Sequence, residues 1–219
     1  MYRLGVPVMA LAVAAAAFAG DFPDPAKLPL NPDLPDTLVL FDGQKVETKE
    51  QWLKKRRPEL QKMFEHYMYG VAPKAPKVNA KIERVDKAAL NGKATLKEIT
   101  LTLQGIKGPK INLLLVVPNK RTGPAPVFVG MNFAGNHAAL DDPKIQLNPN
   151  WVYANRKGVK NNRATEASRG SEAHIWNVEM AIDRGYAVAL FYSGDIDPDR
   201  TDVREGIHQY FGKEYDWST

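Results

Sequence analysis

The sequence contains no cysteine among its 219 residues. Without cysteine a protein has no disulfide, no thiol nucleophile and no thiolate metal ligand, so its stability has to come from a packed apolar core. Long apolar runs are also absent after the first 20 residues. No later run approaches the roughly 20 apolar residues that a membrane-spanning helix needs. These absences exclude thiol chemistry and give no sign of a membrane helix in the rest of the chain.

Serine and histidine are scarce. The four serines are Ser168, Ser171, Ser193 and Ser218, and the four histidines are His66, His137, His174 and His208. A serine nucleophile of the elbow type needs G-x-S-x-G between a strand and a helix. Ser168 is followed by Gly170, but Glu166 replaces the first glycine and no strand precedes it. Ser193 follows a strand but lacks both glycines. We therefore expect neither serine to be a nucleophile.

Metal and phosphate motifs are lacking too. There is no H-E-x-x-H pattern and no glycine-rich phosphate loop. Asp195, Asp197 and Asp199 alternate as in a calcium loop. However, the sixth position is Arg200 instead of glycine and the twelfth is Gly206 instead of glutamate. The pattern favours a turn at the carboxyl end of a sheet strand, which is where α/β folds place their sites. Direct substrate contact by these aspartates is the alternative.

The N-terminus has the pattern of an export signal. Arg3 precedes an apolar, alanine-rich run, and Ala17-Phe18-Ala19 is a cleavage site of the A-x-A kind. We expect a signal peptide over residues 1–20, a Pro- and Asp-rich arm over residues 21–47, and one domain over residues 48–219. The mature protein is then expected to be soluble and periplasmic or secreted.

The formal net charge of +5 is small and spread along the chain. The densest basic run, Lys54-Lys55-Arg56-Arg57, has the composition of a solvated helix face, and no array of stacking aromatics accompanies it. We expect no nucleic-acid partner, and no membrane association after signal cleavage. A mildly basic exported protein could favour an acidic polysaccharide.

Secondary-structure signals begin with a capping box, Thr48 with Gln51, which predicts a helix from Lys49. Pro58 suits the first turn of a second helical stretch, and Gly70 predicts the helix end. Antiparallel strands are expected over residues 78–82, 96–103 and 111–117, with Asn91-Gly92 as a hairpin turn.

The second half of the chain has the pattern strand, helix, strand. Residues 125–133 and 186–192 are expected to be buried parallel strands, joined by a helix over residues 171–184 with Ile175, Val178 and Ile182 inward. Residues 134–170 are polar with little periodicity, which is typical of a functional or mobile loop. The fold class is therefore α/β, with antiparallel entry strands followed by parallel strands.

Gly135-Asn136-His137 directly follows the strand that ends at Phe133. In α/β-hydrolases the equivalent loop often lends a backbone N–H to an oxyanion hole. Asn136, His137 and Asp195 are therefore the candidate pocket or oxyanion-loop residues. The alternative for His137 is a side chain that only hydrogen-bonds the loop.

Several stretches in order resemble carbohydrate esterase family 15, the glucuronoyl esterase-like group that includes bacterial proteins called acetylxylan esterases. The matching stretches are Trp52, Arg56-Arg57-Pro58-Glu59-Leu60, Phe64-Glu65-His66-Tyr67-Met68-Tyr69-Gly70, Asn132-Phe133-Ala134-Gly135-Asn136-His137, Ser168-Arg169-Gly170, Arg184-Gly185-Tyr186-Ala187-Val188-Ala189 and Gly194-Asp195-Ile196-Asp197-Pro198-Asp199. The resemblance extends over residues 22–219 and concerns the N-terminal half of the family's domain.

The resemblance implies an α/β-hydrolase three-layer sandwich whose C-terminal half is missing here. It implies a serine esterase that cleaves esters of plant cell-wall polysaccharide, glucuronoyl or acetyl esters of xylan, and that needs no cofactor. The family's serine lies in Gly-x-Ser-Arg-x-Gly-Lys, with a histidine and an acid downstream. Ser168-Arg169-Gly170 lies upstream of the strand at residues 186–192 and does not match this motif. No catalytic residue is carried over, and we expect this chain to be inactive and poorly soluble alone.

Two other functions stay open. An exported, non-catalytic carbohydrate-binding protein could use its aromatic side chains as stacking surfaces; the candidates are Trp52, Trp151, Tyr153, Trp176 and Trp217. A different α/β-hydrolase, such as a deacetylase or a peptidase, would share the fold, because a fold does not decide the substrate.

Overall fold

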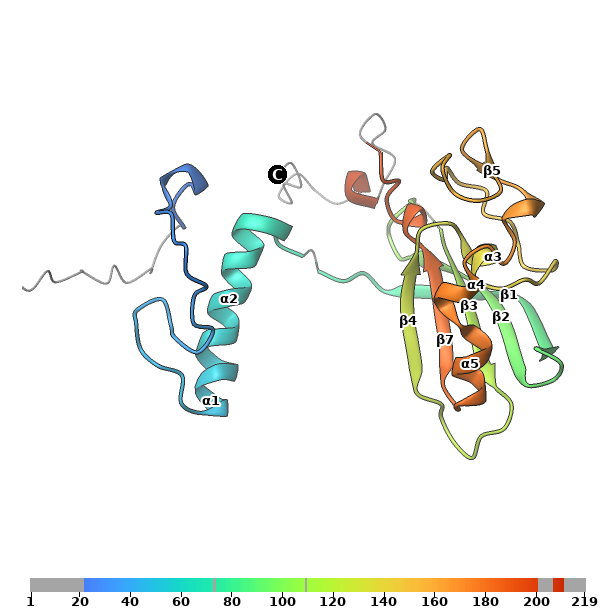
Figure 1. Cartoon of the computed structure of the whole chain (residues 1–219), viewed down its shortest axis with the longest axis horizontal. Helices are drawn as coiled ribbons and strands as arrows, with labels where there is room; N and C mark the ends of the chain where they lie inside the picture. The colour runs from blue at the N-terminus through green and yellow to red at the C-terminus, as the bar shows by residue number, and fades with distance from the viewer. Residues whose placement is uncertain (1–21, 73, 109, 201–206, 211–219) are drawn as a thin grey trace, which may run out of the picture. The chain divides into compact units, whose positions relative to one another are not determined.

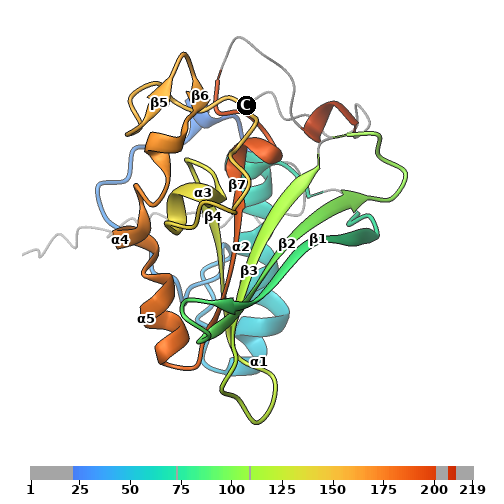
Figure 2. The ribbon, with the colours of Figure 1, turned by 90° about the vertical axis from the view of Figure 1, so that its right-hand side faces the viewer.

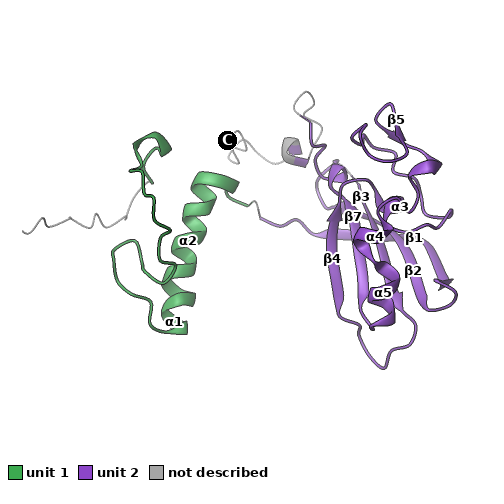
Figure 3. Cartoon of the chain, viewed as in Figure 1, with its two compact units in different colours: residues 1–73, 213–219 green, residues 74–212 purple. Residues whose placement is uncertain are grey.

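The computed structural model describes residues 22–72, 74–108, 110–200 and 207–210. The chain forms two compact units, residues 1–73 with 213–219 and residues 74–212 (Figure 3). The expected signal peptide, Trp217 and Ser218 lie outside the described residues, and the expected domain boundaries stay predictions. Within the described ranges, no helix has the length and apolar character that crossing a membrane requires.

The first unit is built on a helical run that starts where the sequence predicts. Its consecutive segments are α1 (Lys49–Gln51), the π-helical η2 (Trp52–Arg56), α2 (Arg57–Phe64) and the π-helical η3 (Glu65–Tyr69). Both hydrogen bonds of the Thr48–Gln51 capping box are present. Pro58 lies in the first turn of α2, and Gly70, with a φ of 66°, ends the run, as expected.

Arg56 corrects the prediction that the basic run is a solvated helix face, because its side chain is only 4% exposed. Its Nε donates to the carbonyl oxygen of Thr37 at 3.0 Å, and its Nη1 lies 2.7 Å from Glu59 Oε2. The guanidinium also lies over the ring of Phe41, 5.0 Å from its centroid. Arg56 therefore ties the proline-rich arm to the helix.

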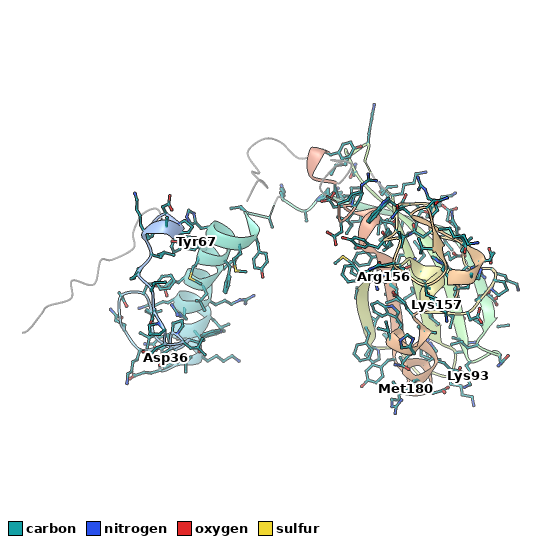
Figure 4. The ribbon with its side chains drawn as sticks, turned by 45° about the horizontal axis from the view of Figure 1, so that its top comes forward. Asp36, Tyr67, Lys93, Arg156, Lys157 and Met180 are labelled. Carbon is teal, nitrogen blue, oxygen red and sulfur yellow. The ribbon has the colours of Figure 1, made fainter. Side chains whose placement is uncertain are left out.

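The start of the arm is held by aromatic contacts. After the short helix η1 (Pro25–Lys27), the arm passes from Tyr67, which contacts Pro23, to Arg56, which contacts Thr37. The Tyr67 hydroxyl donates to the carbonyl oxygen of Pro23 at 2.7 Å, and the Phe22 ring lies 5.6 Å from the Tyr67 ring (Figure 4). The arm is therefore packed on the helix of its own unit.

The second unit contains a mixed five-stranded sheet with strand order β1-β2-β3-β7-β4 (Figure 1). The strands are β1 (Val78–Ala89), β2 (Ala94–Leu103), β3 (Ile111–Pro118), β4 (Val127–Asn132) and β7 (Ala187–Tyr192). β2 is antiparallel to both β1 and β3, β3 is antiparallel to β7, and β4 is parallel to β7. This confirms antiparallel entry strands followed by parallel ones.

The hairpin between β1 and β2 turns where the sequence predicts. Leu90, Asn91 and Gly92 have φ values of 52°, 57° and 83°. Asparagine and glycine tolerate this left-handed backbone better than other residues. Lys93, beside the turn, forms ion pairs with Glu179 at 2.8 Å and Asp183 at 3.0 Å (Figure 4).

The helix expected over residues 171–184 is divided in two. Asn177 adopts a left-handed conformation (φ 45°, ψ 43°) between α4 (Ala173–Trp176) and α5 (Val178–Asp183). Val178 and Ile182 are buried as expected, but Ile175 is 58% exposed, so its inward placement was wrong. The break turns α4 away from the direction of a single continuous helix.

The core lies between one face of the sheet and α5 (Figure 2). Its largest members alternate along β2, β3 and β7, as expected for one face of a sheet, and meet α5; they are Leu96, Leu114, Val116, Val188, Leu190, Val178 and Ile182. Gly130 allows close packing here, because a Cβ atom would lie 2.5 Å from the Trp176 ring.

The strand expected to be fully buried at residues 125–133 is instead an edge strand. Val127, Val129 and Met131 are 49%, 68% and 45% exposed on the face of β4 opposite α5. Among the described strands, β4 pairs only with β7. The apolar composition of β4 was correctly recognised, but composition alone does not say which neighbours are present.

The segment expected to be a long polar loop folds over the sheet edge. It contains α3 (Asn136–Ala139), the hairpin β5 (Val159–Lys160) and β6 (Arg163–Ala164), and the short helix η4 (Glu166–Ser168). It buries Ala138, Ala139, Ile145 and Val152. Two further short helices, η5 (Ser193–Asp195) and η6 (Ile207–Tyr210), follow β7.

Candidate functional site

The candidate residues gather at one end of the sheet, where the carboxyl ends of β4 and β7 lie. Because β3 is antiparallel to β7, its first residues lie at this same edge. Asn136 follows β4, Asp195 follows β7, and Asn112 is the second residue of β3. In α/β folds this edge carries the ligand sites.

Asn112 joins two of the three predicted residues. Its carbonyl oxygen accepts a 2.7 Å hydrogen bond from Asn136 Nδ2. Its backbone N–H and its side-chain amide donate to Asp195 Oδ2, at 2.7 Å and 3.1 Å. Sequence reasoning missed Asn112; the available signal was a polar residue inside the apolar run of residues 111–117.

Asp195 is a buried carboxylate, 2% exposed. Besides Asn112, the side-chain amide of Asn150 donates to its Oδ1 at 2.7 Å. Burial raises the pKa of Asp195, and the hydrogen bonds from Asn112 and Asn150 oppose that rise. Each carboxylate oxygen already accepts a hydrogen bond. Asp195 therefore joins β3, through Asn112, to the loop that contains Asn150.

A small cavity of about 70 Å³ opens beside this network. Its polar lining residues come from β1, β2, β3, the end of β7 and the loops that follow β4 and β7, and include Glu98, Asn112, Asn136, Asn148, Tyr192 and Asp195. A wider, open cavity of about 760 Å³ shares Asn112 and Asp195 with it. Asn136 and Asp195 thus face one cavity, whereas His137 lines neither.

His137 is completely buried and contacts Ser168. The imidazole Nε2 lies 2.7 Å from Ser168 Oγ, and the Ser168 hydroxyl donates to the carbonyl oxygen of Thr165 at 2.6 Å. The backbone N–H of Asn148 points at His137 Nδ1 at 3.4 Å. These partners place the imidazole proton on Nε2, so His137 donates to Ser168.

This arrangement is the reverse of an activated serine. A nucleophilic serine donates its proton to a base, whereas the Ser168 hydroxyl is committed to a carbonyl and its oxygen accepts from the imidazole. Burial, and then the charge of Arg169, lower the pKa of His137 to about 4, so the ring is neutral at pH 7. Ser168 is 2% exposed and lines neither cavity. The pair joins segments 31 residues apart, which no local sequence signal indicates.

The loop before His137 depends on glycine. Gly135 has a φ of 106°, and a Cβ atom there would lie 2.6 Å from the Asn148 Cβ. Its backbone N–H donates to Asn132 Oδ1 at 2.6 Å. That N–H is therefore engaged in holding the turn, and it does not serve as an oxyanion donor in this conformation.

The other residues named from the sequence have structural contacts. Arg169 Nη1 donates to the carbonyl oxygen of Ile145 at 2.6 Å, and its guanidinium pairs with Glu166. The Ser193 carbonyl oxygen accepts from Ile196 and Asp197 in the turn after β7, and Ser193 lines neither cavity. In the part of the chain that the structure describes, no group of three or more metal-ligating side chains comes together.

Comparison with known proteins gives a consistent set of relatives, although no protein-family profile matches the chain. Over 183 residues the chain is 41% identical to carbohydrate esterase MZ0003 from an unknown prokaryotic organism, covering 83% of this chain and 42% of that protein. A glucuronoyl esterase from Solibacter usitatus superposes with a TM-score of 0.75 at 39% identity, covering 86% of this chain and 47% of that one.

A third relative is described as a promiscuous CE15 esterase from a marine bacterial metagenome. It superposes with a TM-score of 0.72 at 40% identity, over 85% of this chain and 47% of that one. The present chain thus spans about half the length of the relatives it matches, and the match lies in their N-terminal part.

Proposed function

Because the chain is related to the N-terminal part of the carbohydrate esterase family 15 glucuronoyl esterases, we propose that it forms the N-terminal part of an exported serine esterase. The proposed substrates are glucuronoyl or acetyl esters of xylan in plant cell walls. The observation that carries the proposal is 40% identity to a CE15 esterase over 85% of this chain, which has the strands of a partial α/β-hydrolase sheet. A cavity lies at the end of this sheet where Asn112, Asn136 and Asp195 meet.

We further propose that the described residues supply the scaffold and the small cavity, while the nucleophile, base and acid come from residues that this chain does not contain. Ser168 is buried and held as a donor to Thr165, and Ser193 lies in a turn away from both cavities. Removing a complete nucleophile system costs about a millionfold in rate in comparable triads. The chain alone is therefore expected to show no serine-dependent turnover.

A chimera tests this proposal. Residues 22–200 of this chain would replace the matching N-terminal part of carbohydrate esterase MZ0003, keeping that protein's remaining residues. The substrates are a benzyl ester of glucuronic acid and an acetylated xylo-oligosaccharide. We expect ester hydrolysis by the chimera and none by the present chain. The control is a second chimera in which the serine of a Gly-x-Ser-Arg-x-Gly motif in the MZ0003 portion, the nucleophile that the resemblance implies, is changed to alanine; it should be inactive.

Two results would contradict the proposal. One is hydrolysis by the present chain alone that disappears on Ser168→Ala. The other is a folded chimera that cleaves neither ester while the parent enzyme cleaves at least one. Hydrolysis of the acetyl ester alone would keep the esterase class and exclude the glucuronoyl substrate.

Of the alternatives, carbohydrate binding has one supporting observation. Trp151 lines the wider cavity, and the centroid of the Tyr153 ring lies 4.7 Å from the centroid of the Trp151 ring. Trp176 is less suitable for stacking on a sugar, because its ring packs against Gly130 in the core. Binding and ester cleavage are compatible in one site.

A further inference from the structure

The two edges of the five-stranded sheet differ in charge. The outer strands are β1 and β4 (Figure 1). β4 carries no charged residue, whereas β1 carries Lys81, Glu83, Arg84, Asp86 and Lys87. Charged side chains on an edge strand discourage the addition of a strand from another chain. β4 is therefore the edge that is suited to accept a further strand.

The backbone of β4 offers hydrogen-bonding groups on its outer side. The N–H of Ala187 on β7 donates to the carbonyl oxygen of Pro126 at 2.8 Å, which places the even-numbered residues on the β7 side. The N–H and carbonyl groups of successive residues in a strand point to opposite sides. Those of Val127, Val129 and Met131 therefore point to the outer edge, where no strand of the described ranges pairs with them.

Both faces of β4 are apolar and exposed. Val127, Val129 and Met131 are exposed on the face opposite α5. On the α5 face, Phe128 is 59% exposed, and its ring centroid lies 5.0 Å from that of Tyr186. Strands that are apolar on both faces are typical of parallel sheets with covering layers on both sides. β4 thus has the side chains of a central strand in an edge position.

The length of the relatives indicates what covers this strand. The chain spans 42% of carbohydrate esterase MZ0003 and 47% of the Solibacter usitatus glucuronoyl esterase, and the match lies in their N-terminal part. A second copy of this chain is the competing partner. Two-fold symmetry would make its β4 antiparallel to this one, whereas the composition of β4 favours a parallel neighbour.

We propose that β4 is a docking strand that binds, without a covalent link, the C-terminal part of a family 15 carbohydrate esterase. The choice of partner rests on the proposed function. The partner contributes an apolar strand parallel to β4, which forms hydrogen bonds with the outward backbone groups of Val127, Val129 and Met131. Its apolar side chains cover Phe128 on one face and Val129 on the other.

The test is capture from two coexpressed polypeptides. One is the full present chain, and the other is the part of MZ0003 that follows the matched region, with an affinity tag. We expect the two to co-purify as a 1:1 complex in sedimentation. The tagged part is also coexpressed with the N-terminal part of MZ0003 as a positive control. Capture of that N-terminal part without capture of the present chain would overturn the proposal.

Amide hydrogen exchange identifies the strand that is used. In the chain alone, the Val129 and Met131 amides should exchange quickly and the Gly130 amide slowly, because only the Gly130 amide points toward β7. In the complex, exchange at Val129 and Met131 should slow by at least about tenfold, while the β1 amides are unchanged. A complex in which Val129 and Met131 exchange as in the chain alone would overturn the proposal.

The variant is Val129→Lys, which places a charge on the proposed interface at an exposed position. It should reduce capture by at least about tenfold. The matched control is Ile82→Lys on β1, also exposed, which should be captured as the wild type is. An equal effect in both variants would overturn the choice of β4. Homodimers alone, formed through β4 in the presence of the tagged part, would assign the strand to a second copy and likewise overturn the proposal.

The two proposals fail separately, because docking is measured without turnover. If the complex forms but neither it nor the esterase chimera cleaves an ester, the docking strand stands and the esterase proposal fails. If the chimera cleaves esters but the separate polypeptides do not associate, only the docking proposal is lost.

Discussion

The Nε2 atom of His137 lies 2.7 Å from Ser168 Oγ, and in this contact the imidazole is the donor. The direction follows from two neighbours: the Asn148 N–H points at Nδ1, and the Ser168 hydroxyl is used by Thr165. A serine beside a histidine is usually examined as a catalytic pair. Here the direction of the hydrogen bonds makes it a structural pair.

The first prediction concerns Ser168→Ala. The substitution leaves the buried Nε2–H of His137 without an acceptor, so the free energy of unfolding should fall by about 1–3 kcal/mol. Urea denaturation measures it, with Ser171→Ala as the control. In the esterase chimera, the folded variant should keep its turnover. Loss of turnover with unchanged stability would instead make Ser168 catalytic.

The second prediction concerns pH. The pKa of His137 is about 4 in the folded chain and about 6.5 in an unfolded one. Between these values the unfolded state binds more protons, so stability is full above pH 6.5 and falls as the pH drops toward 4. The loss should be up to about 3 kcal/mol, from the size of the shift.

The matched variant is His137→Gln, whose side-chain amide can still donate to Ser168 but does not titrate. The difference between the wild type and this variant isolates the histidine from Asp195, whose raised pKa acts in the opposite direction. Identical pH profiles for the wild type and His137→Gln would contradict the prediction.

The third prediction concerns Asp195→Ala. It leaves the amide groups of Asn112 and Asn150 without their acceptor, and should lower the free energy of unfolding by about 2 kcal/mol or more. Asp195→Asn should cost less, because the Asn150 amide can rotate to present its oxygen. Asp197→Asn, exposed in the same turn, is the control. Urea denaturation measures the free energy of unfolding of each variant. Equal stability of all three variants would contradict a stabilising role for the Asp195 hydrogen bonds to Asn112 and Asn150.

The fourth prediction concerns Arg56→Lys in the first unit. Lysine keeps the charge but loses the fork that reaches Thr37 and Glu59, so the arm should detach more readily. We expect faster proteolytic cleavage within residues 22–47 and a loss of about 2–4 kcal/mol in the unfolding of this unit. Arg57→Lys, the exposed neighbour, should behave as the wild type. The same cleavage rate in both variants would contradict the assignment.

The fifth prediction concerns the β4 edge. β4 carries no charged residue, and Val129 is 68% exposed. An uncharged, apolar edge strand promotes association between chains. Val129→Lys should therefore reduce self-association of the chain in sedimentation or light scattering. Ile82→Lys should change self-association little, because β1 already carries the charged residues Lys81, Glu83 and Arg84. If Val129→Lys self-associates as strongly as the wild type, association uses another surface.

Local signals predicted several elements correctly. The Thr48–Gln51 capping box, the Gly70 helix end and the Asn91-Gly92 turn each depend on a few adjacent residues. Three placements were wrong. Ile175 has helical spacing but lies in a short helix that Asn177 ends. Arg56 has the composition of a surface residue but fills a site made by Thr37, Phe41 and Glu59. β4 has the composition of a buried strand, but among the described strands it pairs only with β7.

The candidate site shows the same division. Asn136 and Asp195 could be placed at one sheet edge, because both directly follow strands that the sequence reveals. Their link through Asn112 depends on β3 entering the sheet antiparallel beside β7, which the order of elements along the chain does not specify.

Amino-acid order alone determined the lack of thiol chemistry, the alternation of strand and helix, and the family to which the chain is similar, because composition, periodicity and motifs are properties of neighbours along the chain. Only the folded arrangement decided that His137 donates to Ser168 and that Asp195 is shared by two asparagines. These contacts join segments far apart in the sequence, and their geometry depends on packing that no local pattern encodes.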